Sequence, residues 1–284
     1  MTTTRGVEGT SLDDIPGWFP WIDQVVFAHF LSPGSAVAHG NLVELGVYLG
    51  KSAALIGRFL GAGETFIVCD LFGRDPASEA NRQENAKSYP GLTRAAFEGN
   101  YLARFDRLPT IVADYSSAIV DHVEAGTVRF LHVDASHLYE HVVVDIDSAA
   151  KLMRPDGVVA FDDYRSDHTP GVAAAVWEAV FTKGLQPICL TQQKLYATFG
   201  DREPHQERLR RWLPGPAGLS WQVQSIADRP VLRLARASTP QPADGVPSGP
   251  SADLELAKLA LRLGALERRV RGLQTRESGQ PTDR

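Results

Sequence analysis

Short apolar runs alternate with stretches of helical periodicity over much of the chain. The apolar runs cover residues 41–45, 65–71, 110–113, 128–133 and 157–161. The stretches with helical spacing between or after them cover residues 52–60, 79–88, 116–122, 142–152 and 171–183. Strands that are almost continuously apolar and alternate with helices are typical of a parallel sheet covered on both faces. The pattern therefore predicts a doubly wound α/β fold.

The regions beside this repeat predict further elements. Residues 18–31 carry apolar side chains near helical spacing and predict an amphipathic helix. Residues 187–190 and 195–199 are separated by four polar residues, which predicts an antiparallel hairpin that closes the sheet. Farther on, residues 203–212 predict a helix, and residues 221–234 predict a second hairpin.

The last part of the chain changes character. Residues 237–251 are rich in Pro, Ser, Gly and Ala, which predicts a flexible linker. Within residues 252–274, leucine and valine recur at alternating spacings of three and four, as in a heptad seam. We expect this helix to associate with a second copy of the chain; the alternative is that it docks on its own domain. The predicted segments are a helical cap (1–35), a core (36–200), an extension (201–236), a linker (237–251), a heptad helix (252–274) and a disordered tail (275–284).

Composition narrows the class of protein. The chain has 284 residues, of which 43% are hydrophobic and 22% charged, as in ordinary globular proteins. The formal net charge of −5 provides no global positive field for nucleic acid. No apolar run is long enough for a membrane span, and the N-terminus lacks the pattern of a secretory signal. Two cysteines in apolar runs indicate a reducing compartment, so we expect a cytoplasmic protein.

A glycine loop follows the first predicted strand. The segment from Glu44 to Ser52 reads E-L-G-V-Y-L-G-K-S, and its glycines, Gly46 and Gly50, permit a tight turn and a close approach of backbone to a ligand. It lacks the glycine spacing of a P-loop and of a nicotinamide dinucleotide site. Asp70 ends the second strand, at the position where an acidic residue commonly holds ribose hydroxyls. Together these features favour a cofactor that contains adenosine.

Acidic residues end the fourth and fifth strands. Asp134 follows one, and Asp162 and Asp163 follow the other. The topology makes these strand ends adjacent, so the carboxylates should converge, and their repulsion would raise their pKa values unless a cation or a proton lies among them. Mg²⁺ prefers such oxygen ligands and is therefore the expected ion. The alternative to a metal site is that Asp162 and Asp163 cap the helix that follows. His137, three residues after Asp134, is a candidate general base.

These motifs resemble those of class I S-adenosylmethionine-dependent methyltransferases. The segments E-L-G-V-Y-x-G-K-S, C-D-L-F, H-V-D-A-S-H-x-Y-E and P-D-G-V-V-A-F-D-D-Y are similar to the macrocin O-methyltransferase-like family of sugar O-methyltransferases, over residues 36–200. The resemblance implies a Rossmann-like fold, Mg²⁺ held by Asp134, Asp162 and Asp163, and His137 as the base. It also implies a hydroxyl of a sugar as acceptor, in a small molecule or an oligosaccharide. The implied S-adenosylmethionine site comprises Glu44, Gly46, Tyr48, Gly50, Ser52, Asp70, Asp114 and Asp134.

Two other readings stay open. A catechol-type O-methyltransferase uses a similar metal cradle, although such enzymes usually have Asp-Asn where this chain has Asp162 and Asp163. A non-catalytic scaffold that associates through the heptad helix is disfavoured, since the acidic positions are all present. Aromatic residues that could stack on a sugar at the rim of the crevice are Tyr48, Tyr139, Tyr164 and Trp177, although the spacing of Trp177 also suits a core position.

Overall fold

The computed structural model describes residues 11–32, 39–76, 78–79, 81–83, 89, 91–215 and 218–237. The helices are η1 (Leu12–Asp14), α1 (Trp21–Leu31), α2 (Lys51–Gly57), α4 (Arg94–Leu102), η2 (Ser116–Asp121), α5 (Tyr139–Leu152), α6 (Pro170–Thr182) and α7 (Glu203–Trp212). The strands are β1 (Asn41–Leu45), β2 (Phe66–Cys69), β3 (Thr110–Val112), β4 (Val128–Val133), β5 (Met153–Phe161), β6 (Gln186–Leu190), β7 (Leu195–Thr198), β8 (Leu219–Ile226) and β9 (Arg229–Arg236). Among those residues, no helix has the length and apolar character needed to cross a membrane.

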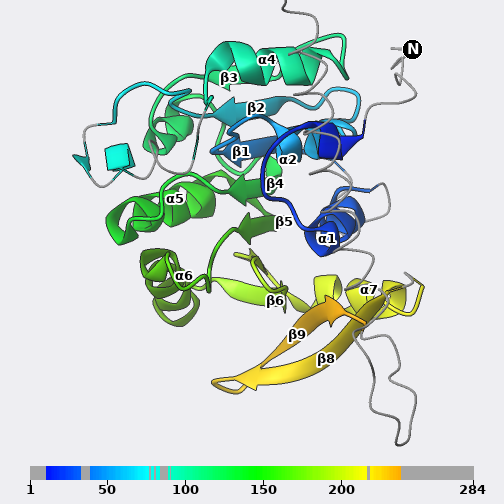
Figure 1. Cartoon of the computed structure of the whole chain (residues 1–284). Coiled ribbons are helices and arrows are strands. Elements are labelled where there is room, and N and C mark those ends of the chain that lie inside the picture. The colour runs from blue at the N-terminus through cyan, green and yellow to red at the C-terminus, as the bar shows by residue number, and fades with distance from the viewer. Residues whose placement is uncertain are drawn as a thin grey trace, which may run out of the picture. The chain divides into compact units, whose positions relative to one another are not determined.

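The described strands form one mixed sheet in the order β3-β2-β1-β4-β5-β7-β6-β9-β8 (Figure 1). Strands β1 to β5 are parallel to one another, and β7 runs antiparallel to both β5 and β6. The closing antiparallel hairpin and the Rossmann-like α/β architecture are therefore confirmed. The order changes direction between β1 and β4, where a doubly wound sheet leaves a crevice at its carboxyl edge.

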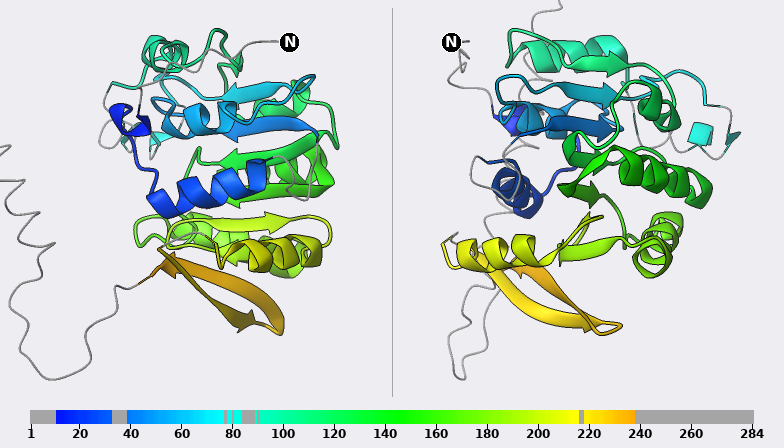
Figure 2. Two further views of the ribbon diagram at one scale, coloured as in Figure 1. Left: turned by 90° about the vertical axis from the view of Figure 1, so that its right-hand side faces the viewer. Right: turned by 180° about the vertical axis from the view of Figure 1, so that it is seen from behind.

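Helices cover both faces of the sheet, and each face has its own apolar core. Figures 1 and 2 show α1, α2 and α7 on one face and α5 and α6 on the other. Strand residues alternate between the two cores: Leu42 packs with Phe27 and Phe130, whereas Val43 packs with Leu131 and Ile146. This alternation explains why β1, β2 and β4 are mostly apolar, because both faces of these strands are buried.

The second hairpin extends the same sheet. Strand β9 pairs in parallel with β6, and β8 pairs antiparallel with β9. Its turn residues, Ala227 and Asp228, both have positive φ, which is the geometry of a two-residue turn between strands. Residues 219–236 thus add two strands to the sheet that the core begins.

Several predicted elements differ in detail from the observed ones. Helix α1 begins at Trp21, after Pro20, and not at residue 18. Residues 116–121 form a 3₁₀ helix, and the helix α4 was missed, because it begins in a segment without a recognised motif. Most of the predicted helix over residues 79–88, the linker beyond Ala237, the heptad helix and the tail lie outside the described residues.

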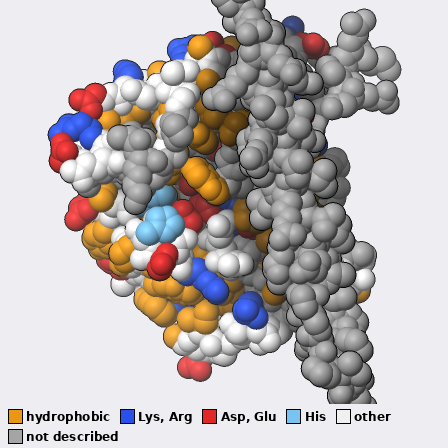
Figure 3. All heavy atoms as spheres, viewed as in Figure 1, with side chains coloured by type: hydrophobic (Ala, Val, Ile, Leu, Met, Phe, Trp, Pro, Cys, Tyr) orange, Lys and Arg blue, Asp and Glu red, His pale blue; other side chains and the backbone are white. Residues whose placement is uncertain are grey.

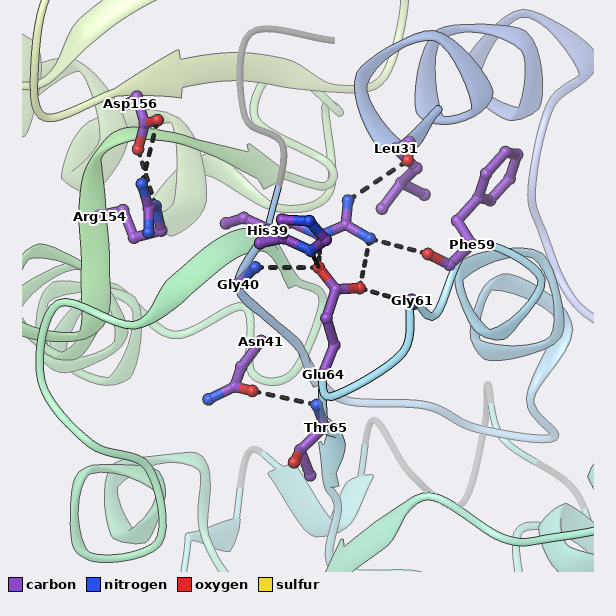
Figure 4. Close-up of polar contacts among 11 residues, drawn as sticks. Leu31, His39, Gly40, Asn41, Phe59, Gly61, Glu64, Thr65, Arg154 and Asp156 are labelled. Carbon is purple, nitrogen blue, oxygen red and sulfur yellow. Dashed lines mark hydrogen bonds and ion pairs between the residues drawn. The ribbon is translucent and has the colours of Figure 1, made fainter. Parts of the chain in front are cut away.

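A buried ion pair ties the amino ends of the central strands to the helices beside them (Figure 4). Arg129 of β4 donates from Nε to Glu64 Oε1 at 2.8 Å and from Nη2 to Glu64 Oε2 at 2.9 Å. The same guanidinium donates to the carbonyls of Leu31 and Phe59, at the ends of α1 and α2. Glu64 also accepts from the backbone of Gly40 and Gly61. Burial raises the pKa of Glu64, but these hydrogen bonds lower it further, to below its ordinary value.

We predict that Arg129→Met lowers the free energy of unfolding by about 3–5 kcal/mol at pH 7, since it leaves the Glu64 carboxylate buried without its cation. The pKa of Glu64 is lower in the folded state, so the pair stabilises the protein above the ordinary pKa of 4.5, and this contribution is lost as the pH falls below it. Urea unfolding at pH 7 and at pH 3.5 measures both effects.

The matched control is Arg154→Met. Arg154 pairs with Asp156 at 2.9 Å, but both side chains are about 40% exposed (Figure 4). This change should cost less than about 1 kcal/mol. Equal losses for the two variants would contradict the structural role assigned to Arg129.

Candidate functional site

A cavity of about 420 Å³ opens at the carboxyl ends of β1, β2, β4 and β5. Figure 3 shows histidine and acidic side chains gathered in a hollow on this face, next to hydrophobic ones. The predicted site residues that line the cavity are Gly46, Tyr48, Ser52, Asp70, Asp114, Asp134, His137, Asp162 and Asp163. The structure thus brings together residues that lie as much as 117 positions apart in the sequence.

Two predicted cofactor residues do not line this cavity. Glu44 is fully buried in β1, where its Oε1 lies 2.8 Å from Nδ1 of His132. Gly50 precedes α2 with φ +91°, and a Cβ there would lie 3.0 Å from the ring of Phe97. Their places are structural: Glu44 anchors a neighbouring histidine, and Gly50 lets the loop turn into α2 under an aromatic ring.

The glycine loop passes very close to the strand beside it. Gly46 has φ +78°, and a Cβ at this position would lie 1.9 Å from the backbone oxygen of Asp134. No side chain fits there, because both the conformation and the contact require glycine. The loop after β1 therefore sits directly against the start of the acidic segment after β4.

Asp70 organises the same loop. Its Oδ2 accepts from the backbone N–H of Val47 at 2.8 Å and of Tyr48 at 3.2 Å, and its Oδ1 accepts from Phe72 at 2.7 Å. Burial raises the pKa of Asp70, and the three N–H donors oppose this rise. The prediction of a ribose ligand missed this role, because backbone donors leave no trace in the sequence pattern.

Asp114 follows β3 and lines the cavity at the end next to β2 and β3. Its Oδ1 accepts from the backbone N–H of Tyr115 at 2.8 Å and lies 3.5 Å from Nη2 of Arg74. The thiol of Cys69 contacts the backbone oxygens of Asp114 and Tyr115, and burial raises its pKa to about 12. Cys69 is therefore a neutral thiol that lines the cavity.

Asp134, Asp162 and Asp163, called here the acidic cluster, meet where β4 and β5 end. Val133 pairs with Phe161, and the N–H of Asp162 donates to the carbonyl of Val133 at 3.0 Å. The predicted convergence of these carboxylates is confirmed. Burial, and after it the charge of Asp162, raises the pKa of Asp134 well above its ordinary value.

His137 extends from the loop between β4 and α5 toward the same cluster. Its Nε2 lies 3.6 Å from Oδ2 of Asp163, and both residues line the cavity. Asp163 has φ +51°, and its Oδ1 accepts from the hydroxyl of Ser166 at 2.6 Å. The Ser166 contact and the turn fix the carboxylate that faces the histidine.

Lys194 contacts the acidic cluster and was not predicted from the sequence. Its ammonium forms an ion pair with Oδ2 of Asp162 and lies 3.1 Å from Nε2 of His132, with the side chain 1% exposed. Burial tends to raise the pKa of Asp162, but the charge of Lys194 holds it below its ordinary value. In the sequence, Lys194 is the last of four polar residues between two predicted strands, where an exposed turn is expected. The sequence offered one indication that Lys194 is buried. It lies two residues before the buried Tyr196, and residues two apart along a strand point to the same face.

The aromatic rim differs from the predicted one. Tyr48 lines the cavity as expected, and its ring stacks on Trp18 at 6.0 Å and meets Tyr89 edge-on at 5.4 Å. Tyr164 is buried against Trp177, and the exposed Tyr139 hydroxyl bonds to Glu178. These last three aromatic residues belong to packing around α5 and α6, since none of them lines the cavity.

Comparison with known proteins gives one family match. Residues 43–164 match a family model described as a methyltransferase domain. No curated protein matches the chain. The matched region runs from β1 to the residue after Asp163, so it contains the glycine loop, Asp70 and the acidic cluster.

Solved structures similar to this chain include three methyltransferases or cofactor-bound relatives. The O-methyltransferase NovP is 21% identical, with 57% of this chain and 72% of that one covered and a TM-score of 0.46. CalS11, a TDP-rhamnose 3′-O-methyltransferase of calicheamicin biosynthesis, is 14% identical, with 63% and 79% covered and a TM-score of 0.44. Cofactor-bound Rv0187 from MTB is 16% identical, with 68% and 86% covered and a TM-score of 0.47. At this level of similarity none of them decides the acceptor of this chain.

The family match agrees with the site built from the residues. The glycine loop, Asp70 and Asp114 follow β1, β2 and β3 in turn, and they line one cavity at the switch point of the sheet. Residues 43–164 of this chain, which hold these loops, are thus similar to a methyltransferase domain.

Proposed function

We propose that this protein transfers the methyl group of S-adenosylmethionine to a hydroxyl of a sugar, in a glycan or a glycosylated metabolite. The observation that carries the proposal is the pair of His137 and Asp163, beside Asp134 and Asp162, in the same cavity as the glycine loop. A base and carboxylates at the end of a cofactor cavity suit a hydroxyl acceptor, which must lose a proton as it is methylated.

The cofactor would lie along the carboxyl ends of β1, β2 and β3. Asp70 holds the backbone of Val47 and Tyr48 in place, and Gly46 allows the loop to approach the ligand. Asp114 lies at the end of the cavity away from the acidic cluster, where we propose that the adenine binds. Tyr48 and Ser52 line the cavity at the beginning of α2.

The transfer requires a nucleophilic oxygen in line with the methyl carbon. The hydroxyl oxygen forms a bond to the methyl carbon, the carbon–sulfur bond breaks, and its electron pair goes to sulfur, so that S-adenosylhomocysteine leaves neutral at sulfur. The hydroxyl proton goes to Nε2 of His137. Asp163, 3.6 Å from this atom, stabilises the charge that the imidazole gains.

The side chains of the acidic cluster are chemically suited to a divalent cation. Within the described part of the chain, the acidic cluster has three carboxylates and the one ammonium of Lys194, and the pKa of Asp134 is raised by burial and by its acidic neighbours. Carboxylate oxygens are the ligands that Mg²⁺ prefers. We propose that Asp134, Asp162 and Asp163 hold Mg²⁺, which when bound lowers the pKa of the acceptor hydroxyl.

Transfer of a labelled methyl group tests the acceptor class directly. The full chain is incubated with labelled S-adenosylmethionine and Mg²⁺, with methyl mannosides and rhamnosides in one series and catechols in the other. The proposal expects label on a glycoside. Label on catechols alone would favour the catechol-type alternative and contradict the sugar acceptor.

His137→Ala should lower kcat by about 10²–10⁴-fold on an accepted substrate, since the proton acceptor is removed. The affinity for S-adenosylhomocysteine should stay within about twofold of the original value, because the proposed cofactor contacts lie on other loops. Initial rates and calorimetry measure the two quantities. His122→Ala, an exposed histidine at the end of η2, is the control and should change neither. Full turnover in His137→Ala would remove this residue from the mechanism.

Asp70→Ala should weaken cofactor binding by about 10–100-fold, because three backbone N–H groups of the loop lose a charged acceptor. Equilibrium dialysis with labelled S-adenosylmethionine measures the change. The control is Asp147→Ala. It removes an exposed carboxylate of α5 that pairs with Lys183, the residue after α6. Unchanged affinity in Asp70→Ala would mean that the cofactor does not depend on this loop.

A further inference from the structure

Lys194 is a charged side chain in a fully enclosed place. It lies just before β7, packs over the rings of Phe19 and Phe27 at 5.6 and 5.8 Å, and is 1% exposed. Burial of an ammonium is costly unless partners compensate for the lost water. The partners here are Asp162 and His132.

The hydrogen-bond inventory fixes how His132 must be protonated in this arrangement. An ammonium has only donors, so Nζ of Lys194 donates to Nε2 of His132 at 3.1 Å, and that nitrogen must present its lone pair. The proton of the neutral ring is then on Nδ1, which donates to Oε1 of Glu44 at 2.8 Å. The result is a buried chain of contacts from Glu44 through His132 and Lys194 to Asp162.

This chain of contacts bears on where a metal ion can bind. Among the described residues, His132, Asp134 and Asp162 place ligand atoms within 4.8 Å of one another, which is a spacing suited to a metal ion. The ammonium of Lys194 already contacts two of these three groups, and it uses the one lone pair that His132 could give to a metal.

We infer that Lys194 is a positioning residue that acts as the inner cation of the acidic cluster. Its ammonium holds Asp162 and also occupies the lone pair on Nε2 of His132. A divalent ion is thereby confined to the carboxylates that face the cavity. The inference rests on the proposed function, because it concerns the Mg²⁺ proposed there. It adds that the ammonium of Lys194 determines which side chains can bind the metal ion.

Metal binding by variants tests this role, with Mn²⁺ alone as the probe. Lys194→Met keeps the length and apolar stem but removes the charge, so that Nε2 of His132 becomes available as a ligand. We expect Lys194→Met to bind Mn²⁺ at least about tenfold more tightly than the original chain, by calorimetry or electron paramagnetic resonance. The double variant Lys194→Met/His132→Asn should lose this gain, because the freed nitrogen is gone.

Two further measurements separate this role from a merely structural one. His132→Asn in the otherwise unchanged chain keeps an N–H donor toward Glu44 but removes Nε2, and it should leave Mn²⁺ affinity within about twofold. Lys183→Met removes an exposed ammonium paired with Asp147 and should behave like the original chain. Binding of S-adenosylhomocysteine to each variant reports whether the cofactor site is folded.

The contradicting results are specific. The inference is overturned if Lys194→Met binds S-adenosylhomocysteine normally but binds Mn²⁺ no more tightly than the original protein does. A tenfold loss of Mn²⁺ affinity in His132→Asn would overturn it as well, since it would mean that the histidine is already a ligand. If Lys194→Met fails to fold, the His132→Asn result decides. Failure of the original chain to bind S-adenosylhomocysteine would instead count against the proposed function.

Discussion

The burial of carboxylates at the ends of β4 and β5 is the constraint on which the rest of the site depends. Asp162 is 8% exposed, and its charge raises the pKa of Asp134 beside it. Such a group is tolerated only with a cation close by, and Lys194, the residue before β7, provides one. The pairing of the antiparallel strand β7 with β5 brings this ammonium close to the carboxylates.

The switch point of the sheet explains why the glycine loop and the acidic cluster share a cavity. Strands β1 and β4 are neighbours with carboxyl ends side by side, so Gly46 lies against the backbone of Asp134. A methyl donor bound along the loop would therefore end close to His137 and Asp163. The separation of roles follows from the strands: β1 to β3 carry the groups proposed for the cofactor, and β4, β5 and β7 carry those proposed for the acceptor.

Residues whose role follows from strand order could be predicted from the sequence, and residues whose role follows from packing could not. The convergence of Asp134 and Asp162 follows once their strands are adjacent, and the apolar runs reveal that order. Glu44 lies within β1, near its carboxyl end, and its side chain turns toward His132, because side-chain direction depends on neighbours that the pattern does not specify. Lys194 was missed since a lysine between two strands usually lies in solvent. The helix α4 was missed because its apolar face is narrow, with Phe97 and Tyr101 buried.

The most direct test of the account is a calorimetric titration of the full chain with S-adenosylhomocysteine, in Mg²⁺ and again in EDTA. The account assigns the cofactor to the loops after β1, β2 and β3, apart from the proposed metal ligands, so it predicts micromolar binding in both buffers. Absence of binding in both would contradict the central claim that this cavity holds S-adenosylmethionine.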